Sequence, residues 1–380
     1  GPRRTVEGIR DMTAIAGLDA KTDLTGVVVG GVIREDLLDR LYDISRVDLP
    51  YSDRARRGSV SAASFDWVRQ RARAAADNAY VETAEFATTG AAGVTAVVDG
   101  AHAPLNRYRN HVQVSSVGVS ISQQALASNS IGGSAADQLG LANVEIRQDI
   151  EYMIVGRNQA TVVGNGASTA PRAGSYLCFV DVNWNGVSTN DLYVSVASAS
   201  PSSEGGWNSS TYLFEAATIG TPTAAALAES DIRDMIQTMY KMGAADPGKM
   251  MTCMSAPEIK RVISEYYYTS TAKAAPLIKT SGEGPDQRAV GSVTVIDTDF
   301  ATLELVPNRF MSTFATGCYG LFIFDPNWQE IVWQKGITAT KQGQSGLVDR
   351  WLLSGYWSLR PHPETMGAIM DISTGAMTAT

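Results

Sequence analysis

Apolar residues recur at three- and four-residue spacing along residues 134–164, which is the spacing of one helix face. Ser134 suits the N-cap, and a glycine-rich stop follows at residues 164–166. The pattern predicts a helix over about 134–164, with its apolar stripe against the last sheet and Arg147 paired with Glu151 on the outer side. The helix residues that we single out are Leu139, Ile146, Ile150, Glu151, Met153 and Ile154.

Apolar and polar residues alternate along residues 59–71 and 97–122, and alternation is typical of strands. The segment between them, 72–96, is rich in alanine, threonine and glycine. We therefore predict a long two-stranded excursion that buries too little surface to stand alone and lies on another surface, such as that of a second subunit. Residues 34–46 precede it, where Leu37, Leu38, Leu41 and Ile44 have the spacing of a short helix.

Helix and strand patterns alternate in the second half of the chain. A helix is predicted from Ser230 to Gly243, a strand at 249–254, a helix opening at Ser255-Ala256-Pro257-Glu258 and a strand at 292–297, which together indicate a compact α+β lobe. From residue 300 onward we expect mostly strands, at 303–307, 320–324, 330–334, 350–359 and 367–372. Residues 165–222 are polar and predict loops or short strands, one of them at 176–182.

The composition limits the function classes. The 380 residues carry a net charge of −8, which argues against a dedicated nucleic-acid reader. The three cysteines lie far apart, so neither a zinc site nor a disulfide framework is predicted, and a reducing cytosol suits them. Without a run of about 18 apolar residues we expect no membrane span. The start at Gly1-Pro2 fits either removal of a leader or an engineered cleavage site.

Catalytic motifs give little support to an enzyme. The three histidines are isolated, and Gly343-Gln344-Ser345-Gly346 resembles a serine-hydrolase turn only loosely, so a hydrolase with an unrecognised site stays an alternative. Arginines, in contrast, gather on and beside the predicted excursion. They are Arg54, Arg56, Arg57, Arg69, Arg71, Arg73, Arg107 and Arg109. Either they dock a basic arm on acidic neighbours, or they form a solvated surface.

Several short motifs carry a family resemblance. They include Asn110-His111-Val112-Gln113, Asp149-Ile150-Glu151 followed by Gly156, and Leu303–Met311 after Thr298-Asp299-Phe300. With the order of elements, they resemble the major capsid proteins of tailed phages, which have the Hong Kong 97-type fold. That resemblance implies an α+β subunit with an N-terminal arm (1–50), an extended hairpin loop (51–122), a peripheral domain (123–222 and 292–380) and an axial domain (223–291).

The resemblance also implies a function. It predicts a structural protein with no enzymatic activity and no cofactor, which forms hexamers and pentamers of an icosahedral shell around double-stranded DNA contacted non-specifically. Portal, scaffold or decoration proteins would be further partners, and the protein would reside in the virion after assembly in the host cytoplasm. The expected contacts between subunits are Arg54, Arg56, Arg57, Arg69, Arg71, Arg107, Arg109, Asn110 and Gln113. A related encapsulin-type shell and a tail or decoration protein stay open as alternatives.

Overall fold

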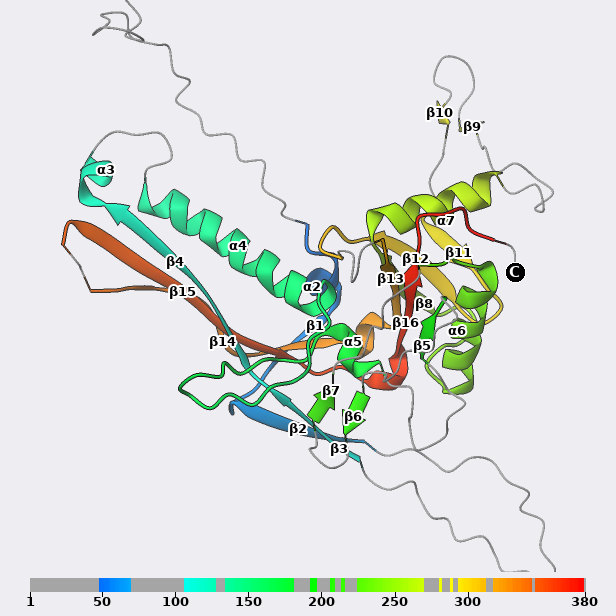
Figure 1. Cartoon of the computed structure of the whole chain (residues 1–380), viewed down its shortest axis with the longest axis horizontal. Helices are drawn as coiled ribbons and strands as arrows, with labels where there is room; N and C mark the ends of the chain where they lie inside the picture. The colour runs from blue at the N-terminus through cyan, green and yellow to red at the C-terminus, as the bar shows by residue number, and fades with distance from the viewer. Residues whose placement is uncertain are drawn as a thin grey trace, which may run out of the picture.

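The structure, a computed structural model, has two large sheets of different shape joined by a long helix (Figure 1). It describes residues 48–69, 106–127, 134–180, 192–196, 206–208, 213–215, 224–269, 280–281, 288–289, 293–311, 317–343 and 346–378. Most of the predicted N-terminal arm and residues 70–105 of the predicted excursion lie outside these ranges.

The first sheet is long and narrow. Its strand order is β1 (Arg56–Ser59), β14 (Glu330–Lys341), β15 (Val348–Leu359) and β4 (Gln113–Ser122). β1 runs parallel to β14, and the other pairs are antiparallel. Both ends of the predicted excursion, in β1 and β4, therefore pair with strands from the end of the chain. Within the described part of the excursion, β2 (Ser64–Arg69) and β3 (Asn106–His111) form a separate antiparallel hairpin stem.

The second sheet forms the core of a rounder lobe. Its order is β11 (Val295–Asp297), β12 (Thr302–Pro307), β8 (Met250–Ser255), β13 (Tyr319–Phe324), β16 (Met366–Ile372) and β5 (Tyr193–Ser195). Helices α6 (Glu229–Lys241) and α7 (Pro257–Thr269) cover it in Figure 1. β8 comes from the predicted axial segment, but its partners β12 and β13 come from the segment predicted as peripheral. A boundary at residue 292 therefore cuts through one continuous sheet.

Short elements complete the described chain. The helices are α2 (Pro50–Arg54), α3 (Gln123–Ala127), α5 (Tyr176–Phe179), η4 (Pro326–Trp328) and η5 (Pro363–Thr365). Two small hairpins pair β6 (Gly206–Asn208) with β7 (Leu213–Glu215) and β9 (Thr280–Ser281) with β10 (Arg288–Ala289). Among the described residues, the helices are too short or too polar to cross a membrane.

The long helix α4 (Ala135–Val155) begins where the sequence predicts it. The Ser134 side chain accepts a hydrogen bond from the Asp137 N–H at 3.1 Å, as an N-cap does. The predicted end near residue 164 is wrong, because the helix stops at Gly156. A Cβ at Gly156 would lie 2.4 Å from the carbonyl oxygen of Phe310, so a glycine is needed where the end of α4 passes the backbone of Phe310.

The apolar stripe of α4 packs on the long sheet as predicted. Ile146, Ile150 and Ile154 are buried, Leu139 and Met153 are half-buried, and the helix contacts β4 and β15. Figure 1 shows α4 running along these strands for most of its length. The helix thus spans the distance between the far end of the long sheet and the rounder lobe.

Two local predictions are corrected. The apolar run at residue 176 forms the helix α5 rather than a strand. Tyr176 turns inward there, and its one hydroxyl hydrogen is shared between the carbonyls of Ile323 and Gly367, each at 3.1 Å. Helix α6 begins at Glu229, not after Ser230, since the Asp231 carboxylate accepts from the N–H of Ala228 at 2.8 Å.

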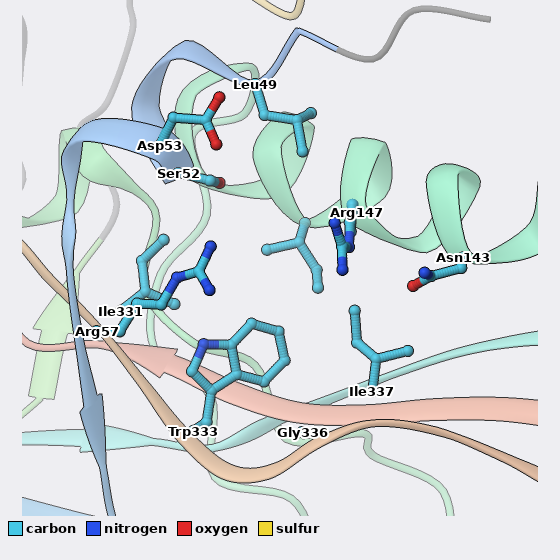
Figure 2. A pocket seen from close by; sticks show the side chains of 11 residues that line it. Leu49, Ser52, Asp53, Arg57, Asn143, Arg147, Ile331, Trp333, Gly336 and Ile337 are labelled. Atoms are coloured by element: carbon cyan, nitrogen blue, oxygen red, sulfur yellow. The ribbon is translucent and has the colours of Figure 1, made fainter. Parts of the chain in front are cut away.

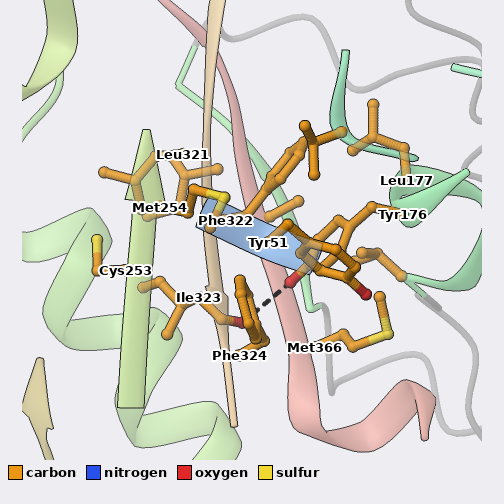
Figure 3. Close-up of a cluster of buried hydrophobic side chains, with 14 of the residues drawn as sticks. Tyr51, Tyr176, Leu177, Cys253, Met254, Leu321, Phe322, Ile323, Phe324 and Met366 are labelled. Atoms are coloured by element: carbon orange, nitrogen blue, oxygen red, sulfur yellow. Dashed lines mark hydrogen bonds between the residues drawn. The ribbon is translucent and has the colours of Figure 1, made fainter. Parts of the chain in front are cut away.

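An aromatic cluster joins the two halves of the molecule (Figure 3). The ring of Tyr176 stacks on Phe322 with centroids 4.3 Å apart, and Tyr51 from α2 contacts both Tyr176 and Phe324. All four rings are fully buried. Aromatic pairs of this kind add roughly 0.5–1.5 kcal/mol each beyond the area that they bury, so α2 is held firmly to the second sheet.

Candidate subunit interface

The root of the hairpin is fixed by a buried carboxylate on α4. Glu151 is fully buried, and its oxygens accept from the backbone N–H groups of Tyr51 and Ser52 at 2.8 and 2.9 Å. They also accept from the Ser52 hydroxyl and from Nδ2 of Asn308, the latter at 2.8 Å. Leu49 at the N-cap of α2 has no side-chain acceptor, so Glu151 satisfies the free N–H groups of that helix.

This arrangement corrects the predicted role of Glu151. The sequence suggested a solvent-facing pair with Arg147, but only Arg147 is exposed. Burial raises the pKa of Glu151, and the hydrogen bonds from Ser52, Tyr51 and Asn308 oppose that rise. The carboxylate joins α4, α2 and the loop after β12, and it thereby sets the position from which β1 and the hairpin stem start.

The hairpin stem has one aromatic face turned to the subunit. Trp67 and Tyr108 pair across the two strands and are buried. Their rings contact Phe214 of β7, with centroids 6.1 and 5.3 Å away. The stem is therefore anchored on its own subunit by this face, which leaves the other face for solvent or a neighbour.

The opposite face of the stem is charged. Asp66 accepts from Nε of Arg107 at 2.7 Å and from Nε of Arg109 at 2.8 Å. The hydrogen bond from Arg109 is the largest cause of a lowered pKa at Asp66, and the Arg107 bond adds to it while partial burial opposes it. The same carboxylate raises the pKa of Arg109. Val68 lies beside them with 61% of its surface exposed.

The predicted contact arginines thus have different environments. Arg54 forms an ion pair with Glu304 at 2.9 Å in its own subunit. Arg56 and Arg57 are exposed. Arg69 is the last residue of β2, and Arg71 lies outside the described residues.

Two other predicted contacts are internal. Asn110 is fully buried, donates to the carbonyl of Leu359 at 2.7 Å and accepts from the N–H of His111 at 2.8 Å. Gln113 is buried as well, and its side-chain oxygen accepts from Nε2 of Gln159 at 3.1 Å. We correct their predicted role accordingly: these amides fix the crossing of the hairpin and the loop after α4, because buried amides need internal partners.

The described residues give no support to a catalytic or metal site. Ser345, the nucleophile of the hydrolase alternative, lies outside the described ranges. The three cysteines are buried and unbridged, and burial raises the pKa of each thiol. Within the described part of the chain, no three metal-ligating side chains come together.

Sequence reasoning missed two residues that organise this surface. Asp66 was not singled out, although it lies on the first strand-like segment of the predicted excursion and is directly opposite Arg109 of the second. Asn308 was noticed only as part of a family motif, and no local pattern reveals that it would reach Glu151 across 157 residues of chain.

Comparison with known proteins decides the family. Residues 15–373 match the model of the SU10 major capsid protein family. The chain belongs to this family. It is therefore a major capsid protein of tailed phages, and its place is in the virion. A capsid contains many copies of its major protein, so this capsid protein associates with itself. No curated protein matches the chain.

Solved capsid structures have the same fold. A chain of the cyanophage A-1(L) capsid aligns with a TM-score of 0.57 and 10% identity, covering 90% of this capsid protein and 97% of that chain. A capsid chain of the native GTA particle gives 0.55 and 11%, with 90% and 96% covered. A capsid chain of the Myoviridae phage XM1 gives 0.50 and 10%, with 90% and 99% covered. The α+β fold is thus the predicted Hong Kong 97-type capsid fold.

Proposed function

We propose that this capsid protein forms hexamers and pentamers of an icosahedral shell that encloses double-stranded DNA. The observation that carries the proposal is the match to a major capsid family over residues 15–373. The shape of the subunit supports it, because α4 and the long sheet form an elongated plate beside a rounder lobe (Figure 1). We also propose the division into peripheral and axial domains, with one change: the boundary no longer falls at residue 292, so that all strands of the six-stranded sheet belong to one domain.

The hairpin is the proposed link between subunits. Its stem is anchored by Trp67 and Tyr108, whereas its charged face with Val68 stays exposed on a single subunit. A hairpin of this length gains most of its burial only when a neighbour covers it. Many such weak contacts act together in a closed shell, which multiplies their effect.

Charge would then set the register between neighbours. We retain Arg56, Arg69 and Arg71 as contacts to acidic surfaces of adjacent subunits. Arg107 and Arg109 are already bound to Asp66, so a neighbouring carboxylate would have to share them. Exposed ion pairs weaken as salt rises. Replacing Arg69 and Arg71 together by Glu should therefore reduce assembly more at about 50 mM salt than at about 500 mM, where the charges are screened.

The remaining elements of the proposal concern partners and role. The net charge of −8 favours an enclosing shell that contacts DNA without reading its sequence. Portal and scaffold or decoration proteins are proposed as further partners, and assembly is placed in the host cytoplasm. We propose a purely structural role, with no catalysis by this chain.

The test is the assembly state of the purified full-length chain. Size-exclusion chromatography with light scattering should find rings or particles of hundreds of kilodaltons or more, far above the 40.5 kDa of one chain. Particles purified from infected cells should protect double-stranded DNA from nuclease. A chain that stays monomeric at all concentrations and salts would contradict the proposal.

A further inference from the structure

An open pocket of about 370 Å³ lies between α2, the middle of α4 and β14 (Figure 2). Arg57 and Arg147 line it together with Asp53, and Trp333 adds an apolar ring. Because its charges are mixed, the pocket does not select one class of ligand. The loop that follows α4 holds a group with more specific chemistry.

This loop presents an Asn-Gly pair to solvent. Its base is fixed by an antiparallel bridge between Val162 and Arg172, in which both N–H groups donate to the opposite carbonyl at 3.0 Å. Asn165 and Gly166 lie between them and are exposed. Gly166 has a φ of +74°, where a glycine is favoured, and a Cβ there would meet no atom within 4 Å.

Three backbone N–H groups converge on the side-chain oxygen of Asn165. Its Oδ1 accepts from the N–H groups of Ala167, Ser168 and Thr169 at 3.0, 2.9 and 2.8 Å. Its Nδ2 donates to the hydroxyl of Ser168 at 3.0 Å. Convergent donors of this kind stabilise an oxygen that gains negative charge during a reaction, as in an oxyanion hole.

The backbone nitrogen of Gly166 is the nearest nucleophile to the side-chain carbon Cγ of Asn165. Within the described part of the chain, the Gly166 N–H forms no hydrogen bond. Because Gly166 has no side chain and is exposed, hydroxide from solvent can reach that N–H and remove its proton. The loop thus brings together an open nucleophile, a polarised carbonyl and a hydroxyl on the leaving nitrogen.

We propose that Asn165 deamidates by itself through this arrangement and that the resulting aspartate holds the loop more tightly. Once hydroxide has taken its proton, the nitrogen of Gly166 bonds to Cγ, and the electron pair of the C=O bond moves to Oδ1, where the three donors stabilise it. The carbonyl then re-forms and the Cγ–Nδ2 bond breaks. The nitrogen takes a proton that Ser168 relays from water and leaves as ammonia, so that a five-membered imide remains.

Water opens the imide in the second stage. Addition at Cγ breaks its bond to the Gly166 nitrogen and gives aspartate, whereas addition at the backbone carbonyl gives isoaspartate. The three donors polarise the Cγ carbonyl, so aspartate is the expected main product. Together the two stages consume one water, release one ammonia and add one negative charge to the chain. The new carboxylate accepts charge-assisted hydrogen bonds, which are about twice as strong as neutral ones.

This chemistry belongs to a single subunit and does not depend on how the shell assembles. The test is peptide mapping by mass spectrometry of the full-length chain, incubated either folded or unfolded in guanidinium chloride at the same pH. Asn165 should deamidate about tenfold faster in the folded chain than in the unfolded one. An equal or slower rate in the folded chain would overturn the proposal, because the loop would then protect the amide.

The chain contains its own reference for the intrinsic rate. Residues 185–189, NGVST, repeat the pattern of residues 165–169, NGAST, and lie outside the described ranges. In guanidinium chloride the two asparagines should react at equal rates, because only the sequence acts there. A faster reaction of Asn165 in the denaturant as well would assign its rate to the sequence and would contradict the role of the fold.

Two variants isolate the hydroxyl on the leaving nitrogen. Ser168→Ala should slow deamidation of the folded chain by about fivefold and leave the unfolded chain unchanged. Thr169→Ala is the matched control, since the N–H of Thr169 bonds to Oδ1 but its hydroxyl forms no hydrogen bond with Asn165, and its rate should equal that of the wild type. Equal rates in the two variants would contradict the role of Ser168.

The variant Asn165→Asp tests the product directly. Hydrogen exchange of the backbone amides of residues 167–169 should slow by about fivefold relative to the wild type, because the three donors then face a carboxylate. Faster exchange in this variant would contradict the tighter loop. Isoaspartate as the main product in the folded chain would contradict it as well, since the carboxylate would then not form among the donors.

Discussion

Replacing Glu151 by alanine tests whether a single buried carboxylate holds the hairpin root. The substitution would leave three N–H donors without an acceptor, namely the backbone groups of Tyr51 and Ser52 and Nδ2 of Asn308. Each unsatisfied buried donor costs about 1–3 kcal/mol. Removing the carboxylate also removes the cost of burying a charge, so we expect the low end of the sum, about 3 kcal/mol.

The assay is hydrogen exchange of the backbone amides of Tyr51 and Ser52 in the full-length chain. A loss of about 3 kcal/mol should speed their exchange through local opening by roughly 100-fold. Urea unfolding of the unassembled chain should show the same loss of unfolding free energy. The control is Glu145→Ala, the same change at an exposed position of α4, which should alter stability by no more than about 0.5 kcal/mol.

A matched isostere separates charge from shape. Glu151→Gln keeps the volume but can accept on only one oxygen, so part of the loss should remain. Because burial raises the pKa of Glu151 in the folded chain, the wild-type carboxyl binds its proton more tightly when folded. The unfolding free energy of the wild type should therefore rise relative to Glu151→Gln as the pH falls through the folded pKa toward 4.5. If Glu151→Ala behaved like Glu145→Ala, the argument would be refuted.

Three further predictions concern other parts of the subunit. Gly156→Ala should lower the unfolding free energy by roughly 1–3 kcal/mol in thermal unfolding, because the new Cβ would lie against the Phe310 carbonyl. In the control Gly118→Ala the Cβ meets no atom within 4 Å, and the loss of unfolding free energy should be less than half as large. Deleting residues 72–97 should leave the circular dichroism spectrum of the lobes intact but abolish particles in electron micrographs; normal particles would remove the hairpin from its proposed role. The ion pairs lower the pKa of Asp66, so its contribution to the unfolding free energy should be full above pH 3.8 and should vanish as the pH falls through the lower pKa of the folded state. Acid unfolding of Asp66→Asn and of the wild type measures this contribution as their difference. A difference that does not change with pH would contradict the ion-pair geometry.

Elements with a strong local pattern could be predicted from the sequence. The N-cap Ser134 and the stripe Ile146, Ile150 and Ile154 place α4 correctly, because capping and three- and four-residue spacing are local properties. The late strands at 303–307, 320–324, 350–359 and 367–372 lie within two residues of their observed bounds, but β14 continues to Lys341, well past the predicted end at residue 334. Residues that act across long sequence separations could not be placed in this way.

Glu151 shows the limit most clearly. On a helical surface an acid four residues after an arginine is usually a solvent-facing pair, and nothing local shows that α2 would present its N-terminus at this point. The early end of α4 at Gly156 has a similar cause, since it depends on the backbone of Phe310. The surface arginines were located by composition, but their partners Asp66 and Glu304 became evident only from the strand pairing and the fold.

The most direct test of the central claim is a cryo-electron microscopy reconstruction of particles assembled from this chain. We expect closed icosahedral shells with this fold in both six-fold and five-fold rings, and with the β2–β3 hairpin lying over an adjacent subunit. Open sheets, filaments or isolated subunits in which the hairpin touches no neighbour would contradict the account.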